Sequence, residues 1–405
     1  SLSYATSLLG GFMADKLIGA RYALLIGGIL SAVGILIFVF AQNPSLIYLA
    51  LSLLSLGSGC CKPNISASLA LLFENPNDTR RDISFMGLYV GMNLGSLSGP
   101  IVCGFVSTYW GWTMGILLIA VGFITGCLVF FIHIRPKLQQ QVTSIKHWTY
   151  AGLLMLTTVV ALLFLFHERK ALDSLMVITA IASMIIICVR YGRCNQDERE
   201  GIRKIIPIIL LFSFFCALYE QSGSSVMLFL ENHVDRHVLG HTIPAISLLS
   251  INPILVLACG AMAPFILNKY LCKPSTYTKF SLGFFLTAAS FALLAGGIAL
   301  AHHKVALSWV ILFFAFQTMG EMLIIPGGYA RVSQYAPDRY MSLFMSLWLV
   351  AIAYGHYLAG FLAKLSVNPS MECYVSCCHE STFFMKLCFL ALLGCLPIFL
   401  RFKKR

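Results

Sequence analysis

Three charged residues stand inside long apolar stretches of this 405-residue chain: Lys62, Glu220 and Glu321. An ionisable side chain at bilayer depth costs about 2.5–3.5 kcal/mol even on lenient insertion scales, so it persists mainly where it faces a polar cavity or a partner. A lysine can bind a carboxylate, and a buried carboxyl group can take and release protons. The three residues therefore predict a polar path through the protein for a charged solute or a proton.

The composition around these residues is that of an integral membrane protein. Hydrophobic residues make up 59% of the chain and charged residues only 11%, against about 25% charged in soluble domains. No Asp, Glu, Lys or Arg occurs in 22–61 or in 83–134, and each run is long enough for two membrane helices of about 20 residues. A β-barrel would instead show short alternating segments. The sequence thus predicts an all-α bundle in a bilayer.

The basic residues are distributed as the positive-inside rule describes. With the Lys16–Arg21 loop taken as cytoplasmic, 20 of the 28 Lys and Arg residues fall in loops on that side. Only Arg169, Lys170, Arg236 and Lys304 fall in the opposite loops. The formal net charge of +12 therefore reflects the topology of a multi-pass membrane protein and not a nucleic-acid partner. We expect the protein in the plasma membrane, namely a bacterial inner membrane.

Apolar runs between charged loops predict the membrane spans, with boundaries that are open by several residues. They are 1–14, 22–41, 46–72, 84–107, 113–133, 148–166, 173–190, 204–230, 244–268, 280–301, 305–330, 340–364 and 383–400. The first run is too short to cross the membrane. We therefore expect this chain to be a fragment that lacks one helix before Ser1.

With that helix restored, the pattern is six spans, two extra spans and six more. We expect an N-terminal half at 1–134 that lacks its first helix, a linker at 135–203 that carries two inserted helices, and a C-terminal half at 204–405. Two six-helix halves around a central cavity are the architecture of major-facilitator transporters, whose substrates sit near the bilayer midplane.

The turn after the first run has a short pattern of glycines, an acid and basic residues. Gly11, Asp15, Gly19 and Arg21 fit G-x-x-A-D-x-x-x-G-x-R, which resembles the signature loop of the major facilitator superfamily. Glycines allow close helix approach and a short turn, while the charged side chains can pair across helix ends. We expect a cytoplasmic gating loop here.

The run 84–107 combines a glycine repeat with a polar repeat. Glycines every four residues predict a helix face that packs backbone to backbone against a neighbour. Phe85, Tyr89 and Asn93 repeat on another face, where Asn93 either lines a cavity or makes an interhelical hydrogen bond. The glycines are Gly87, Gly91, Gly95 and Gly99.

The three buried charges lie beside helix-disturbing residues. Lys62 precedes Pro63, which bends its helix, and at this depth the lysine needs a carboxylate of the protein or of a substrate. Glu220 opens a polar cluster, and Glu321 precedes Pro326-Gly327-Gly328, where we expect a break in the helix. Desolvation raises the pKa of a carboxyl group and a nearby lysine lowers it, so an acid subject to both can exchange protons. The alternative is a static ion pair that only holds helices together.

Six segments in order along the chain resemble the motifs of the proton-dependent oligopeptide transporters. They are Gly57-Ser58-Gly59-Cys60-Cys61-Lys62-Pro63-Asn64-Ile65, Phe85-x-x-x-Tyr89-x-x-x-Asn93-x-Gly95, Glu220-Gln221-x-Gly223-Ser224-Ser225, Ser250-Ile251-Asn252-Pro253, Gly320-Glu321-Met322-Leu323-Ile324 and Met345-Ser346-Leu347-Trp348. The inserted helix pair is similar to that of bacterial members. The resemblance implies symport of di- and tripeptides with protons by alternating access, with no cofactor or metal.

The resemblance also implies roles for single residues. In the family, the residues matching Lys62 and Asn93 lie near the peptide carboxylate, and the glutamate matching Glu321 lies near the peptide amine. Asn252 and Trp348 match positions that line the binding pocket, which Tyr89 is expected to share. The acid matching Glu220 takes part in gating and proton coupling, where Lys62 and Glu321 are also expected to act.

Some features depart from the family or stay open. The family's E-x-x-E-R motif on the first helix is absent from this chain, and Asp197-Glu198-Arg199-Glu200 in the linker cannot replace it. Cys373, Cys377 and Cys378 are expected in an outside loop, where a disulfide, a metal site or unpaired thiols are the alternatives.

The rival functions are a carrier of another small solute (an amino acid, nitrate or a peptide-like drug), a peptide receptor and a membrane enzyme. The enzyme is disfavoured because no H-E-x-x-H or G-x-S-x-G motif occurs, and the receptor because no sizeable soluble domain is present. We expect a monomer whose partners are peptides, protons and the lipid bilayer.

Overall fold

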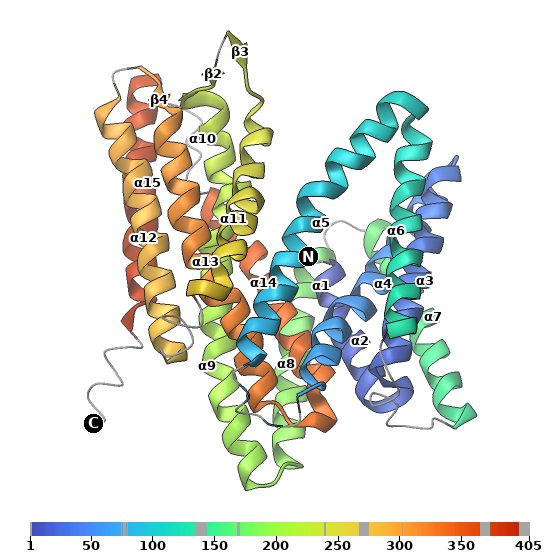
Figure 1. Ribbon diagram of the computed structural model, residues 1–405. Coiled ribbons are helices and arrows are strands. Elements are labelled where there is room, and N and C mark those ends of the chain that lie inside the picture. Colours follow the sequence, from blue (N-terminus) through green and yellow to red (C-terminus); the bar gives the residue numbers. More distant parts are fainter. Residues whose placement is uncertain are drawn as a thin grey trace. The chain divides into compact units, whose positions relative to one another are not determined.

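The computed structural model describes residues 2–73, 75, 78, 80–133, 144–167, 171–238, 240–266, 275–301, 303–364 and 373–396 (Figure 1). The chain forms two compact units. Unit 1 comprises Ser1–Arg81, Ser98–Ile209 and Tyr329–Ala353, and unit 2 comprises Asp82–Leu97, Leu210–Gly328 and Tyr354–Arg405. The predicted division into halves at 134 and 204 stays a prediction.

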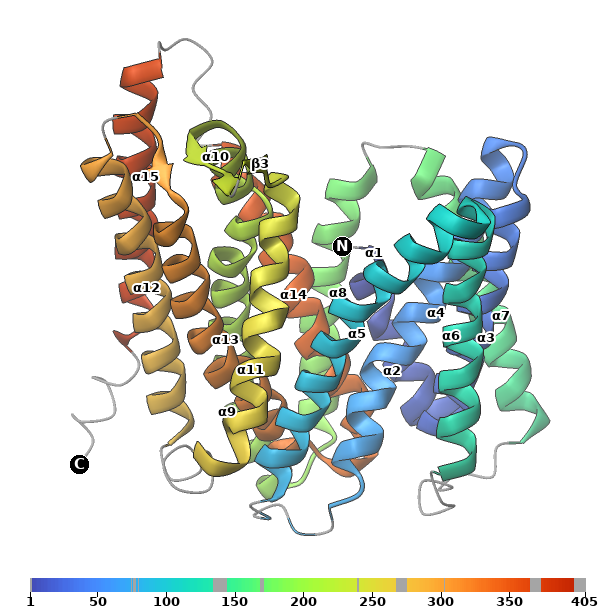
Figure 2. The ribbon, with the colours of Figure 1, turned by 45° about the horizontal axis from the view of Figure 1, so that its top comes forward.

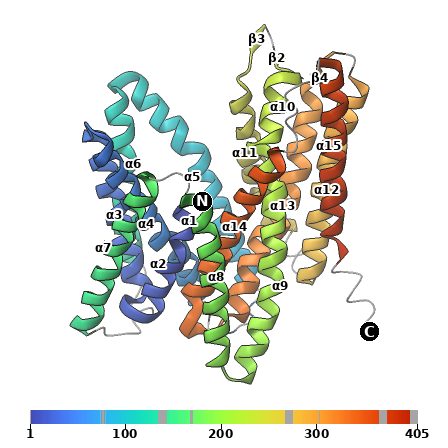
Figure 3. The same ribbon diagram turned by 180° about the vertical axis from the view of Figure 1, so that it is seen from behind.

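Unit 1 is built around a long helix, α3 (Gly19–Phe40), that packs between two others. These are α4 (Pro44–Ala70) and α6 (Trp112–His133), and α7 (Ile145–His167) lies against α4 (Figure 3). Asn43 caps α4, because its side chain accepts a hydrogen bond of 2.9 Å from the Leu46 amide and Pro44 follows it at the first helical position. The remaining elements are α1 (Leu2–Ala5), α2 (Ser7–Met13), a π-helix at Ala14–Ile18 and α8 (Ala171–Gly192).

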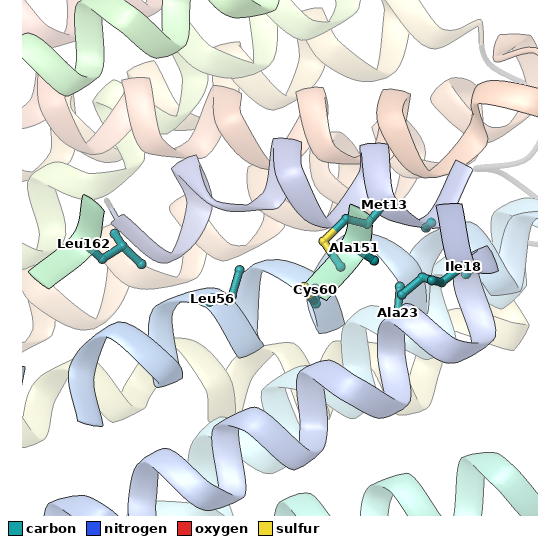
Figure 4. Close-up of a cluster of buried hydrophobic side chains, with 9 residues drawn as sticks. Met13, Ile18, Ala23, Leu56, Cys60, Ala151 and Leu162 are labelled. Carbon is teal, nitrogen blue, oxygen red and sulfur yellow. The ribbon is translucent and has the colours of Figure 1, made fainter. Parts of the chain in front are cut away.

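The core of unit 1 joins segments that are far apart in the sequence. Figure 4 shows Met13, Leu56, Cys60 and Ala151 converging from α2, α4 and α7. All four side chains are fully buried. Their burial fixes α7, the first of the two inserted helices, against the early helices of the chain.

Unit 2 contains a second set of helices with an aromatic core. Helix α12 (Thr276–Leu300) lies along α15 (Cys373–Leu393), with α10 (Ser225–His233) close by (Figure 1). Ser275 caps α12 by accepting from the Thr278 amide at 3.3 Å. The rings of Phe229, Phe291 and Phe384 contact one another, with Phe384 central. The other elements are 3₁₀ turns at Glu220–Gly223 and Ala245–Ser250, and α11 (Ile251–Ile266).

Short strands lie at the end of α10 (Figure 2). β1 (Val234–Asp235) pairs in parallel with β4 (Val305–Ala306), and β2 (His237–Val238) pairs in antiparallel with β3 (His241–Thr242). Each strand has only two residues, so the described residues form an all-α fold.

Four helices pass from one unit into the other along the chain. They are α5 (Arg80–Trp110), α9 (Gln196–Tyr219), α13 (Leu307–Tyr335) and α14 (Met341–Lys364), the last preceded by a 3₁₀ turn at Asp338–Tyr340. Four of the five unit borders within these helices fall within three residues of a proline or glycine: Pro100 in α5, Pro207 in α9, Pro326 in α13 and Gly355 in α14. The fifth, between Arg81 and Asp82 near the start of α5, does not.

The surface is that of a membrane protein. Nine stretches within the described ranges are long and apolar enough to cross a bilayer: Ser3–Phe40, Pro44–Ala70, Arg80–Trp110, Trp112–Ile132, Ile145–Phe166, Gln196–His233, Thr276–Leu300, Leu307–Tyr335 and Asp338–Lys364. Large apolar side chains such as Phe105, Leu156 and Phe285 are more than half exposed, which suits contact with lipid. The predicted all-α membrane bundle is therefore confirmed.

Three local predictions were wrong. Helix α13 continues through Pro326 without a break; membrane helices tolerate proline where other groups satisfy the freed backbone carbonyl. The segment at Cys373 is the start of α15 and not a loop; the side chains of the three cysteines there lie outside the described part. The α5 glycine face is open, since a Cβ at Gly87, Gly91 or Gly95 would meet no described atom of its unit within 4 Å.

The close glycine contacts lie elsewhere. In unit 1, a Cβ on Gly59 of α4 would collide with Thr6, and one on Gly10 of α2 would collide with the Gly59 carbonyl. In unit 2, Gly283 of α12 faces Gly320 of α13, where a Cβ on Gly320 would stand 2.7 Å from the Gly283 carbonyl oxygen. These glycines bring backbones into direct contact, as small residues do in membrane helices.

Candidate functional site

The carboxylate of Glu321 is the centre of a buried polar cluster in unit 2. The residue lies midway along α13 and is 3% exposed. The Tyr89 hydroxyl from α5 donates to one carboxylate oxygen, and the Asn252 amide from α11 donates to the other at 2.7 Å. The structure thus joins three residues that the sequence singled out separately.

Further polar groups hold the donors in place. The Asn252 amide nitrogen also donates to Thr318 Oγ1 at 2.9 Å, and the Tyr219 hydroxyl donates to Asn252 Oδ1 at 3.3 Å. Gln317 Nε2 in turn donates to the Tyr219 carbonyl at 3.1 Å. Because Asn252 has these further contacts, the amide donor on one side of the carboxylate is held in place before any ligand arrives.

The charge on Glu321 is met by neutral donors alone. No basic side chain among the described residues lies within ion-pair distance of this carboxylate. Phenol and amide donors orient a carboxylate without neutralising it, and burial makes its charge costly. Such a group can bind a proton or an ammonium ion.

Asn93 lies one helical turn beyond Tyr89 on α5 and is partly buried. Its amide nitrogen donates to the Tyr89 carbonyl at 3.0 Å. The bond stays within its own helix, and the described residues of unit 2 give Asn93 no interhelical hydrogen bond. Its side-chain oxygen remains an acceptor beside the cluster.

Glu220 occupies the first position of the 3₁₀ turn that follows α9. Its Oε2 lies 3.2 Å from Nδ1 of His356 on α14. The next residue, Gln221, is fully buried and donates to the Ala359 carbonyl at 3.2 Å. The turn therefore docks on α14, and its leading acid faces a histidine.

Lys62 lies in unit 1, within α4. Its ammonium stands 4.2 Å from the ring centroid of Tyr4, a cation–π contact. No carboxylate among the described residues lies within ion-pair distance of Lys62. Trp348 belongs to the same unit, where it is fully buried against the Tyr329 ring at a centroid distance of 5.4 Å. These two residues are thus in unit 1, and the Glu321 cluster is in unit 2.

The predicted gating loop caps a helix. The Asp15 carboxylate accepts the backbone N–H groups of Ser342 at 3.1 Å and Leu343 at 2.8 Å, at the N-terminus of α14, where free N–H groups and the helix dipole favour an anion. Gly11 packs on the same turn, since a Cβ there would collide with Ser342 and Ser346.

The other two residues of the loop motif shape the turn. Gly19 has a φ of 79°, a conformation that glycine adopts without strain. The Arg21 guanidinium lies over the Phe131 ring at 4.7 Å and donates to the Phe131 carbonyl at 3.3 Å.

Several residues of these clusters escaped the sequence reasoning. Tyr219 and Thr318 have residue types that are common in apolar spans, so no signal marked them. His356 did carry a signal, because it is an ionisable residue inside the run 340–364, which has no other Asp, Glu, Lys, Arg or His between Met341 and Ala363. Metal chemistry has no support in the described part, where no group of three His, Cys, Asp or Glu could hold an ion.

Comparison with known proteins gives a consistent match. The POT family model matches residues 21–378. Over 391 residues the chain is 28% identical to a peptide transporter of Yersinia enterocolitica, covering 89% of this chain and 76% of the relative. Over 376 residues it is 29% identical to a di-/tripeptide transporter of Lactococcus lactis, covering 87% and 76%.

A solved structure confirms the predicted fold. The crystal structure of a POT family transporter in complex with a thioalcohol-conjugated peptide matches with a TM-score of 0.73 and 25% identity, over 100% of this chain and 85% of that one. The family match spans most of the chain, and its members are transporters rather than enzymes. The chain therefore belongs to the POT family, as a multi-pass transporter of the plasma membrane.

Proposed function

We propose that the protein carries di- and tripeptides across the membrane together with protons, by alternating access of its two halves. The observation that carries the proposal is the Glu321 carboxylate, which is buried, held by Tyr89 and Asn252, and without a basic partner among the described residues. A peptide ammonium group would supply the missing positive charge. In its absence a proton would do so.

Lys62 supports the same function from the other end of the substrate. Its ammonium, on α4, has an aromatic ring but no carboxylate of the described residues as partner. A peptide carboxylate would fill that place. Opposite fixed charges that bind the two ends of a zwitterion select for its backbone and leave its side chains free to vary.

The relatives support this choice of substrate. Two proteins that resemble the chain are named as a peptide transporter and a di-/tripeptide transporter, and a solved POT transporter holds a conjugated peptide. One other solved POT transporter holds 5-aminolevulinic acid. A carrier of another small amine-bearing acid is therefore the second candidate.

Uptake into proteoliposomes tests the proposal. The full-length protein is reconstituted and the entry of labelled dialanine is followed with and without an inward proton gradient. We expect the gradient to accelerate uptake and to accumulate the peptide. Labelled 5-aminolevulinic acid is tested in parallel: if it is accumulated and dialanine is not, the second candidate replaces the first. Equal rates with and without the gradient for both solutes would refute proton coupling.

A further inference from the structure

We propose that His356 is a proton-exchanging partner of Glu220, so that the two side chains act as one proton-binding pair in the transport cycle. The proposal rests on the proposed proton-coupled function. It adds His356, which belongs to none of the sequence motifs that resemble the family. His356 Nδ1 and Glu220 Oε2 are 3.2 Å apart, within reach of direct proton transfer.

Neighbouring contacts fix the pair in register. Gly355 lies so close to Cys216 on α9 that a Cβ there would collide with it. Four residues beyond Cys216, in the 3₁₀ turn that follows α9, Glu220 meets His356. Gln221 then donates to the carbonyl of Ala359, one turn along α14. Three successive contacts along the same two segments hold the imidazole against the carboxylate.

The pair is less buried than Glu321. The side chains of His356 and Glu220 are 35% and 27% exposed, whereas Glu321 is 3% exposed. The proposal requires that this exposed side of the pair meets an aqueous path. A histidine changes charge between about pH 5 and 8, the range in which a proton gradient acts.

The pair is connected to the buried cluster. Tyr219 precedes Glu220 in the chain and donates to Asn252, which binds Glu321. The titratable groups whose charges interact with Glu220 are Cys216 and Tyr219 on α9 and Glu321 on α13, with His356 on α14. A proton gained by the pair therefore changes the field at the carboxylate that we propose binds the substrate amine.

The proton balance of the step is simple. When the imidazole is neutral and Glu220 is ionised, the pair carries one negative charge. One proton from water forms an N–H bond on the ring and makes the pair neutral overall. Transfer from Nδ1 to Oε2 then breaks that N–H bond, forms the carboxyl O–H bond and leaves a neutral ring. Release to water on the other side restores the starting state.

His356→Asn and His356→Gln test the proposal, because an amide can keep a hydrogen bond to Glu220 but cannot carry the proton. The matched control is His233→Asn, since His233 faces Glu380 at 3.3 Å in a similar pair at the end of α10. Two assays are compared for each protein: peptide exchange without a gradient and uptake driven by a gradient.

We expect both His356 variants to exchange peptide as the wild type does and to lose the acceleration by the gradient. His233→Asn should behave as the wild type in both assays. A merely structural role of His356 predicts instead that exchange and driven uptake fall together.

The outcomes separate the two proposals. If the wild type itself shows no acceleration, the proposed function fails. If the wild type is accelerated and the His356 variants are accelerated equally, or lose exchange as well, the pairing inference fails. Should neither variant insert, ¹⁵N-histidine NMR at a fixed pH decides, because Glu220→Gln alone must change the ring-nitrogen chemical shifts of His356, and unchanged shifts overturn the pair.

Discussion

Asp82 and Lys279 form a buried ion pair, with the ammonium 3.0 Å from a carboxylate oxygen and the two side chains only 9% and 7% exposed. Asp82 lies in the first turn of α5, and Lys279 lies in the first turn of α12. Removing one member of such a pair leaves the other charge buried without that counter-ion.

Lys279→Met should therefore lower the free energy of unfolding by about 3–5 kcal/mol, measured by thermal unfolding in detergent. The double variant Lys279→Met with Asp82→Leu should recover most of the loss, because no uncompensated charge remains. Arg80→Ala is the control, since its exposed pair with Asp78 should contribute no measurable stability. A double variant no more stable than the single one would contradict this assignment.

Glu321→Gln should weaken peptides with a free amine by roughly ten- to hundredfold, since a hydrogen bond to a charged group contributes about 1.5–3 kcal/mol. N-blocked peptides should be affected much less, because they offer no ammonium ion. Competition against labelled dialanine measures both affinities. Glu200→Gln, which changes an exposed carboxylate paired with Lys204, is the control, and equal losses for both peptide classes would refute the role of Glu321 as the amine anchor.

Lys62→Ala should abolish gradient-driven uptake while the protein remains inserted and folded. The physical reason is that no described carboxylate depends on this ammonium ion, so its loss removes an anion-binding charge and breaks no ion pair. Driven uptake and size-exclusion chromatography are measured together, with Lys204→Ala as an exposed control. Accumulation at the wild-type level would show that the lysine is peripheral to transport.

Gly59→Ala and Gly91→Ala should have opposite effects on stability. The first places a methyl group against Thr6 and should cost about 1–3 kcal/mol through overpacking. The second enters open space in its unit and should be neutral or stabilising by up to about 1 kcal/mol through helix propensity. Melting temperatures in the same detergent decide, and a destabilising Gly91→Ala would show that the α5 glycine face is packed.

The sequence predicted the elements well and the contacts unevenly. A run without charges defines a span, and 84–107 lies inside α5 (Arg80–Trp110) as expected. The glycines of that span were predicted to pack against a neighbouring helix. That prediction failed because the spacing of glycines does not reveal which helix, if any, lies beside them. The contacts of Gly59 and Gly10 depend on which helices become adjacent, and that is a property of the whole fold.

The candidate site shows the same limit. Tyr89, Asn252 and Glu321 were each identified because polar groups at depth are unusual, and the structure brings them together. The pairings of Glu220 with His356 and of Asp82 with Lys279 could not be predicted, since each joins segments more than 130 residues apart. A charge at the start of a helix, such as Asp82, also looks like an ordinary boundary residue until its partner is known.

The borders between the two units have a mechanical consequence. Proline lacks the N–H that would bond to the carbonyl four residues back, and Pro100, Pro207 and Pro326 each stand within three residues of a border. At these points α5, α9 and α13 have fewer internal bonds, so they bend there at the lowest energetic cost. The easiest bending points thus lie within helices that cross the unit borders, and not in the connections between helices.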